Sequence, residues 1–264
     1  MSNGTKSPFL VGNVLGRGFS ILFRNAVAFG TIAILLMIPY AAVSALEGLG
    51  FLPRTGFVAL VLQILVGFLL PQAVTAAIVY GTFQDMRNQR TGVGDAISRG
   101  FSLIMPVAGV AIVIGLLTVL AGAPAILVGL AKLGGLQILL GLGLLAGPIF
   151  VLTVFFVATP AVVVERDGVG AAIRRSAELT KGERWRVLGI MAVSWAVGVG
   201  VVLLAVAFAF AAIQAGSALA PSVLLAVAVA FYYALNAVMA TVTYHDLRVA
   251  REGVGTVDIA KVFD

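Results

Sequence analysis

Long stretches of the chain carry no charged side chain, and these stretches locate its apolar segments. Residues 25–46 form one uncharged run of 22, and residues 55–84 form another of 30. The interval 100–164 contains a single charged residue, Lys132, so two segments meet near it. Residues 187–245 hold no Lys, Arg, Asp or Glu over 59 positions, which is too long for one membrane-spanning helix, and we expect a break at 214–222.

Each uncharged run is long enough for one or two membrane-spanning helices, which need about 20 apolar residues each. Backbone groups find no outside hydrogen-bond partner in lipid, so runs of this length must be helical. The alternating segments of about 10 residues that indicate a membrane β-barrel are absent from the sequence. We therefore expect an all-α integral membrane protein with six transmembrane helices, at 26–46, 57–83, 104–131, 137–163, 187–213 and 222–244.

Composition excludes a soluble fold. Hydrophobic residues make up 61% of the 264 positions, while charged residues make up only 11%, against about 25% in soluble domains. The chain contains no cysteine, so it is not a disulfide-stapled scaffold. We expect one membrane domain over 1–264.

The basic residues predict an orientation. Of the 17 Lys and Arg residues, 15 fall on one side of the six spans, and only Arg54 and Lys132 fall on the other. Because cytoplasmic loops are enriched in Lys and Arg, both termini are expected in the cytoplasm. The residues before the first span lack a signal-peptide pattern, so we expect that span to be retained in a bacterial inner-membrane, multi-pass protein.

The segments on the basic side resemble one another. They read VGNVLGRGFS at 11–20, VGDAISRGFS at 93–102 and VGAAIRRSAE at 169–178. This predicts three repeats of one short helix plus two spans, at about 11–92, 93–168 and 169–253, followed by a short cytoplasmic tail at 254–264. An even number of spans per unit keeps every unit in the same orientation, so we expect pseudo-three-fold packing. A sequential six-helix bundle is the alternative.

The repeated segments have a helical period and are too short to span a membrane. In the second, Val93, Ile97 and Phe101 follow one another at four-residue spacing, and polar residues occupy the opposite face. The first and third segments follow the same pattern. We expect amphipathic helices in the headgroup plane, with arginine facing water and phosphate.

Two stretches carry a family resemblance: TKGERWR at 180–186 and YHDLRVAREG at 244–253. They look like a bacterial membrane-protein family that forms the membrane domain of glycerophosphoryl diester phosphodiesterases and is related to YciC-like inner-membrane proteins. The resemblance implies a stand-alone membrane domain without the catalytic domain. That enzyme needs a soluble barrel with histidine and several acidic residues around a metal, whereas this chain has one histidine, His245.

The residues predict no catalytic, cofactor or metal site. Metal ligation needs converging His, Cys, Asp or Glu side chains, and no carboxylate lies inside a predicted span. We therefore expect a non-catalytic protein that organises membrane lipids or partner proteins through its interfacial helices. Its expected partners are membrane lipids, particularly anionic ones, and other membrane proteins, but not nucleic acid. The candidate headgroup contacts are Arg17, Arg99, Arg174, Arg175, Lys181, Arg184, Trp185 and Arg186.

The alternative function is a small permease or a lipid-moving transporter with a cavity between the repeats. Broken helices can mark such sites, and prolines lie within or near several spans. Polar side chains in the spans are the candidates for lining the cavity: Gln63, Gln72, Thr153, Thr159 and Asn236.

Overall fold

The computed structural model describes residues 9–89, 92–130, 135–217 and 219–253, and these residues are almost entirely helical. The helices are α1 (Val11–Arg24), α2 (Ala26–Gly48), α3 (Phe57–Leu62), a π-helical segment (Gln63–Leu69), α4 (Leu70–Met86), α5 (Val93–Ser102), α6 (Ile104–Leu130), α7 (Gly135–Leu144), α8 (Ala146–Val154), α9 (Ala158–Glu165), α10 (Val169–Thr180), α11 (Arg184–Gln214) and α12 (Ala220–Glu252). No strand occurs within these described ranges.

The predicted six spans are confirmed in number and in position. Within the described residues, six helical stretches are long and apolar enough to cross a membrane: Ala26–Gly48, Phe57–Met86, Ile104–Gly129, Leu140–Glu165, Arg184–Gln214 and Ala220–Glu252. Spans two and four each join more than one helical segment. Lys132 and the predicted tail at 254–264 lie outside the described residues.

Span two changes its helical pitch where a proline interrupts the hydrogen-bond ladder. The π-helical segment ends at Leu69, two residues before Pro71, which has no backbone N–H to donate. Side chains near the proline donate to backbone carbonyls. Gln72 Nε2 donates to the carbonyl of Phe68 at 3.2 Å, and Thr75 Oγ1 donates to the carbonyl of Pro71 at 2.8 Å.

Span four is not the single helix that the sequence predicts. It consists of α7, α8 and α9, with a turn at residues 155–157 ahead of Pro160. At this turn the backbone N–H of Ala158 donates to the carbonyl of Phe155, not to that of Val154. The carbonyl of Val154 instead accepts hydrogen bonds from Ser176 Oγ at 2.8 Å and Thr180 Oγ1 at 3.2 Å, both on α10. Hydroxyl groups of the third short helix thus satisfy a carbonyl that the break exposes, which lipid could not do.

Helix α12 is the central element of the fold. Half of its most apolar window is buried inside the protein, against 11–28% for the other five spans. It contacts α11, α2, α4, α1, α9 and α10. Many of its buried side chains are alanines, which let neighbouring helices approach closely.

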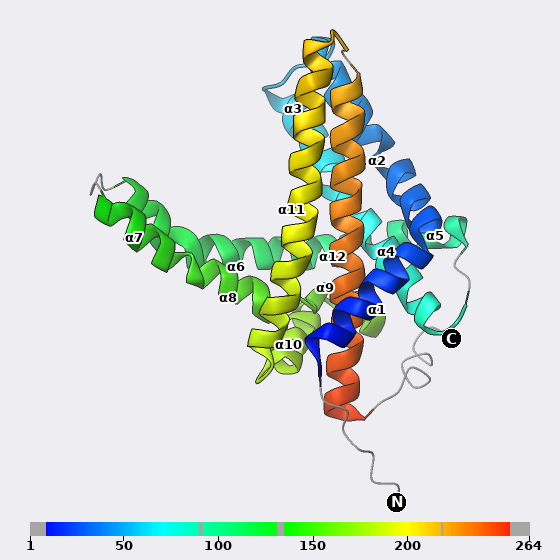
Figure 1. The fold of residues 1–264 in the computed structure, drawn as a ribbon, viewed down its shortest axis with the longest axis vertical. Helices are drawn as coiled ribbons and strands as arrows, with labels where there is room; N and C mark the ends of the chain where they lie inside the picture. The colour runs from blue at the N-terminus through cyan, green and yellow to red at the C-terminus, as the bar shows by residue number, and fades with distance from the viewer. Residues whose placement is uncertain (1–8, 90–91, 131–134, 218, 254–264) are drawn as a thin grey trace, which may run out of the picture.

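The other spans are arranged unevenly around α12. Figure 1 shows α11 and α12 running side by side, whereas α6 with α7 and α8 extends away from them to one side. Helix α6 and α8 contact each other along this arm. The arm is joined to the rest of the protein by contacts of α6 with α4, α9 and α10 and of α8 with α10 and α11.

The three short helices bury the same positions of their aligned sequences. The fourth, eighth and eleventh residues of each segment are buried: Val14, Gly18 and Ile21 in α1, Ala96, Gly100 and Leu103 in and after α5, and Ala172, Ser176 and Leu179 in α10. The larger apolar side chains that the sequence pattern places on one face, such as Ile97 and Phe101, lie beside this buried row and are only partly covered.

The short helices α1, α5 and α10 pack on spans six, two and four, respectively. A Cβ atom added at Gly18 would lie 2.5 Å from Met239 Sδ on α12, and one added at Gly100 would lie 2.6 Å from the backbone oxygen of Ala73 on α4. Ser176 occupies the equivalent place on α10, against Val154. A small residue at this position is what allows the close approach.

We expect replacement of Gly100 by alanine to destabilise the protein, whereas replacement of Gly94 on the same helix does not. The methyl group at position 100 would collide with backbone, at a cost of about 1–3 kcal/mol for an overpacked contact. Nothing lies within 4 Å of the corresponding point at Gly94, where alanine favours the helix slightly. Thermal unfolding of the purified protein in detergent measures both. Equal stability of the two variants would refute the close packing of α5 on α4.

Candidate functional site

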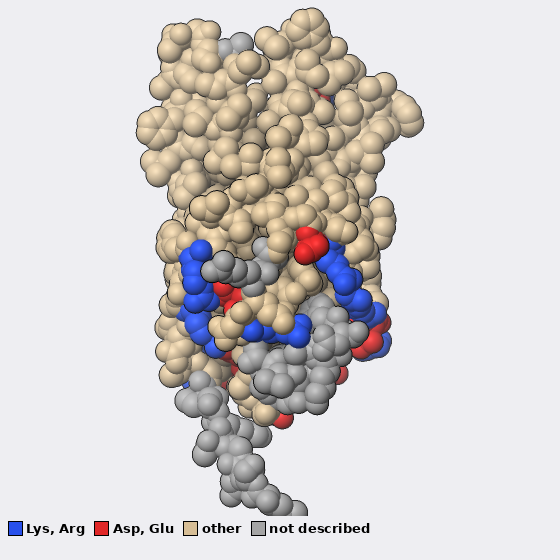
Figure 2. Space-filling model, turned by 90° about the vertical axis from the view of Figure 1, so that its right-hand side faces the viewer, with Lys and Arg blue, Asp and Glu red and all other residues tan. Residues whose placement is uncertain are grey.

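Charged side chains gather at one end of the protein. Figure 2 shows most of the Lys, Arg, Asp and Glu residues of the visible face in its lower half, below a surface of uncharged residues. The elements that meet there are α1, the ends of α4, α9 and α12, and the helix α10. We call this region the charged end.

A network around Arg175 joins α9, α10 and the last turns of α12. Arg175 Nε donates to Glu165 Oε1 at 2.8 Å, and its Nη2 forms an ion pair with Glu252. The hydroxyl of Tyr244 donates to Glu165 Oε1 at 2.6 Å. Arg248 completes the network with a 2.9 Å hydrogen bond from Nε to Glu252 Oε2.

Arg175 is held as a cation by this network. Partial burial on its own would lower the pKa of Arg175, but the hydrogen bonds and charges of Glu165 and Glu252 raise that pKa above its ordinary value. The two carboxylates face two guanidinium groups, Arg175 and Arg248, so the charges balance inside the cluster. The arrangement is therefore a clamp between three helices, and its arginine is already occupied.

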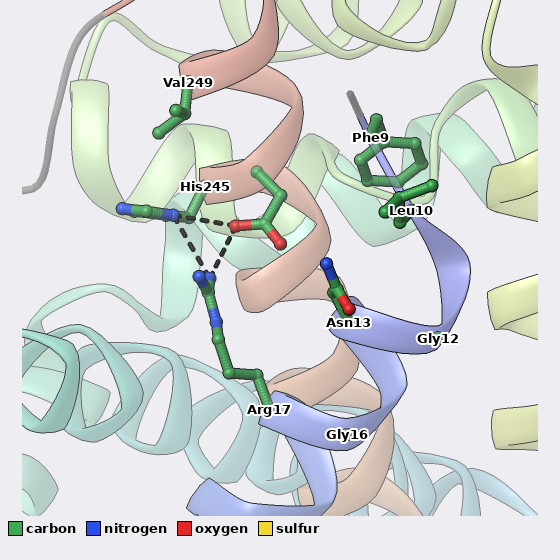
Figure 3. A pocket seen from close by; sticks show the side chains of 9 residues that line it. Phe9, Leu10, Gly12, Asn13, Gly16, Arg17, His245 and Val249 are labelled. Carbon is green, nitrogen blue, oxygen red and sulfur yellow. Dashed lines mark hydrogen bonds and ion pairs between the residues drawn. The ribbon is translucent and has the colours of Figure 1, made fainter. Parts of the chain in front are cut away.

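A second cluster links α1 to α12 beside a cavity of about 540 Å³. Figure 3 shows Arg17 on α1 pointing toward His245 on α12. Arg17 Nη2 lies 2.5 Å from Asp246 Oδ1 and 3.3 Å from His245 Nδ1. His245 is only 7% exposed, and its Nε2 atom has no hydrogen-bond partner among the described residues.

A third cluster ties the end of α1 to the end of α4. Arg24 forms an ion pair with Asp85, and Asn25 Nδ2 donates to Asp85 Oδ1 at 2.7 Å. The hydrogen bond with Asp85 and its negative charge raise the pKa of Arg24. Asp85, Glu165 and Asp246, near the ends of spans two, four and six, are thus each paired with an arginine of a short helix.

The predicted headgroup contacts divide into engaged and open side chains. Besides Arg17 and Arg175, Arg186 is paired with Glu183 at 2.7 Å. The guanidinium of Arg184 stacks 4.9 Å from the centre of the Phe150 ring, and that of Arg99 lies 5.9 Å from the Tyr80 ring. These five basic residues contact other parts of the protein.

The open side chains lie on α10 and at its junction with α11: Arg174 is midway along α10, Lys181 follows its last residue, and Trp185 is at the start of α11. Arg174 and Lys181 are exposed and have no ion-pair partner within the described part of the chain. Trp185, at the start of α11, is 85% exposed. We call Arg174, Lys181 and Trp185 the exposed elbow.

Three of the five residues that the sequence offers as lining a polar cavity lie around one cavity. Gln72, Thr159 and Asn236 line one cavity of about 230 Å³. Gln63 is exposed on the π-helical segment, and Thr153 is buried elsewhere with its hydroxyl donating to the carbonyl of Ile149, so neither lines it.

Several residues of these sites are not predicted by the sequence analysis. Glu165, Tyr244 and Glu252 form the clamp, but their partner Arg175 was expected to face lipid headgroups. Trp195 and Tyr232 also line the cavity. The sequence gives no signal for this, because an aromatic residue in an apolar segment is equally typical of ordinary helix packing. Among the described residues, no group of three or more His, Cys, Asp and Glu is placed to hold a metal ion.

Comparison with known proteins identifies no relative. No family model, no curated protein and no solved structure matches the chain significantly.

We expect replacement of Arg175 by methionine to lower the free energy of unfolding by about 1–3 kcal/mol. The change leaves Glu165 and Glu252, both mostly covered, with one guanidinium fewer to balance them. Its neighbour Arg174 is exposed on the same helix, so Arg174→Met serves as the matched control and should change stability by less than about 0.5 kcal/mol. Denaturant or thermal unfolding in detergent measures the free energy of unfolding of both variants. A loss of the same size in both variants would speak against the clamp.

Proposed function

We propose that this chain is a non-catalytic, multi-pass protein of the bacterial inner membrane that binds anionic lipid headgroups at its charged end. The orientation follows from the distribution of basic residues, which places the charged end and both termini in the cytoplasm. The membrane assignment rests on the six apolar helices of the structure.

We further propose that the chain consists of three related units, 11–92, 93–168 and 169–253. The burial of the same three positions in α1, α5 and α10 supports this. Arg17 and Arg175, at equivalent positions of their segments, also pair with Asp246 and Glu165 near the ends of spans six and four. The likeness concerns how each short helix packs on a span. It does not extend to the direction of the arms, because α6 to α8 extend to one side (Figure 1).

The observation that carries the lipid-binding proposal is the exposed elbow. Two unpaired cations and a highly exposed tryptophan lie on α10, directly after it and at the start of the following span. Tryptophan favours the membrane–water interface, and each basic residue near an anionic surface contributes about 1 kcal/mol. The elbow therefore combines an interfacial anchor with charges that no described carboxylate neutralises.

A second candidate function, a small permease or a lipid-moving transporter, is favoured by the cavity that Gln72, Thr159 and Asn236 line. Both candidate functions use the same six spans, but the first places the ligand at the exposed elbow and the second places it in the cavity. Only the first therefore requires the side chains of the exposed elbow.

We expect the double variant Arg174→Glu with Lys181→Glu to lose anionic lipid. Each basic residue contributes about 1 kcal/mol to the binding of an anionic lipid. Loss of both should therefore lower the preference for phosphatidylglycerol over phosphatidylethanolamine about 30-fold. Native mass spectrometry of protein released from membranes of known composition counts the retained lipids. Arg54→Glu, which reverses an exposed charge outside the charged end, is the control and should retain the parent's lipids. Unchanged phosphatidylglycerol retention in the double variant would overturn the proposal.

A further inference from the structure

The cavity between the spans has an unfilled hydrogen-bonding position. Asn236 on α12 donates from Nδ2 to the carbonyl of Tyr232 at 2.8 Å, which fixes the orientation of its amide. Its Oδ1 atom is buried and has no partner among the described residues. A buried acceptor without a donor is unfavourable, so this oxygen marks a place for a hydrogen-bond donor.

Further neutral polar groups surround this position. Gln72 and Thr75 of α4, Thr159 of α9 and Tyr232 of α12 line the same cavity. The Gln72 and Thr75 side chains each donate to a carbonyl of their own span. Gln72 keeps one N–H donor and its oxygen, Thr75 keeps oxygen lone pairs, and the other two hydroxyl groups can donate and accept. The cavity therefore offers both acceptors and donors, as a ligand hydroxyl group requires.

No charged side chain lines the cavity within the described residues. A charged ligand group would be desolvated there without a counter-ion, which is costly between apolar helices. The volume of about 230 Å³ lies below the 300–1,000 Å³ that is typical for drug-sized ligands. Only a small, neutral group fits these conditions.

Aromatic side chains form part of the remaining, apolar wall. Phe155, Phe156 and Trp195 come from the break in span four and from α11. They provide apolar contact for a hydrocarbon chain that continues from the small polar group. The contributing helices α4, α6, α8, α9, α11 and α12 all belong to spans, so a ligand that reaches the cavity from the bilayer must be amphiphilic.

We propose that this cavity binds the headgroup of a neutral amphiphile that carries a hydroxyl group, with the hydroxyl donating to Asn236 Oδ1. The site is separate from the exposed elbow. Its failure would leave the proposed anionic-lipid function untouched, and a loss of that function would not affect it.

The two tryptophans of the chain allow a direct binding assay. Trp185→Phe removes the exposed one and leaves Trp195, which lines the cavity, as the only reporter. The probe is 2-bromodecan-1-ol, because its bromine, a contact quencher of tryptophan, lies next to the hydroxyl. We expect saturable quenching of Trp195 in detergent solution.

A chemical series on this parent protein tests the ligand class without further mutation. The methyl ether of the probe cannot donate a hydrogen bond, and 2-bromodecanoate is anionic. Loss of one hydrogen bond predicts that the ether needs about five- to tenfold more probe for half-saturation, and the carboxylate should need at least as much. Quenching that rises linearly with all three probes, or a preference for the carboxylate, would overturn the proposal.

Matched variants test the residue. Asn236→Leu keeps the size of the side chain and removes the acceptor, so it should raise the half-saturating concentration of the alcohol about five- to tenfold. Gln63→Leu removes an amide that lies outside the cavity and should leave this concentration unchanged. Equal affinities in the two variants would assign the site to other residues. If Asn236→Leu does not fold, the alcohol–ether comparison on the Trp185→Phe parent decides: equal half-saturating concentrations of the two probes would overturn the proposal.

Discussion

Close packing around α12 is the interaction on which the rest of the structure depends. Apolar burial is a weak organiser between helices in lipid, because lipid tails are as apolar as leucine, so close contact and hydrogen bonds must hold the helices together. Helix α12 meets this need with small buried side chains along its length, and α1, α2, α4 and α11 approach it there. Its last turns replace small residues by Tyr244, Asp246 and Glu252, which bond to α9, α1 and α10.

A second constraint, the lack of hydrogen-bond partners in lipid, connects the breaks in the helices with the candidate sites. Pro71 and Pro160 interrupt two spans, and side-chain hydroxyl and amide groups bind carbonyls near them. The same interruptions bring Gln72 and Thr159 to one cavity with Asn236. Gln72 and Thr75 thus both bind backbone carbonyls near Pro71 and line the cavity.

The sequence predicts the spans and the short helices well because both depend on local properties. Charge-free length determines the spans, and the period of apolar residues identifies α1, α5 and α10. The paired carboxylates depend on contacts between distant residues, such as Arg175 with Glu252, which no local pattern contains. Some of the cavity could have been predicted: Gln63 and Gln72 are nine residues apart, about two and a half helical turns, so a regular helix places them on opposite faces.

The break in span four lay beyond prediction for a different reason. Pro160 signals a disturbance, but the partners of the Val154 carbonyl come from Ser176 and Thr180, more than 20 residues further along the chain. Only the packing of α10 on this span identifies them. The arginines were predicted as lipid contacts because sequence alone does not distinguish Arg174, which is exposed, from Arg175, which is clamped.

Disulfide cross-linking in intact membranes tests the convergence of the short helices on their spans most directly, because the chain has no native cysteine. One pair carries Gly18→Cys with Met239→Cys, and the other carries Gly100→Cys with Ala77→Cys, at positions that the structure places in contact. A third pair, Gly16→Cys with Met239→Cys, starts from a glycine with nothing within 4 Å. Rapid cross-linking of the first two pairs and slow cross-linking of the third is the predicted result. Cross-linking of the third pair as fast as the first, or failure of both contact pairs, would contradict the packing of α1 on α12 and α5 on α4.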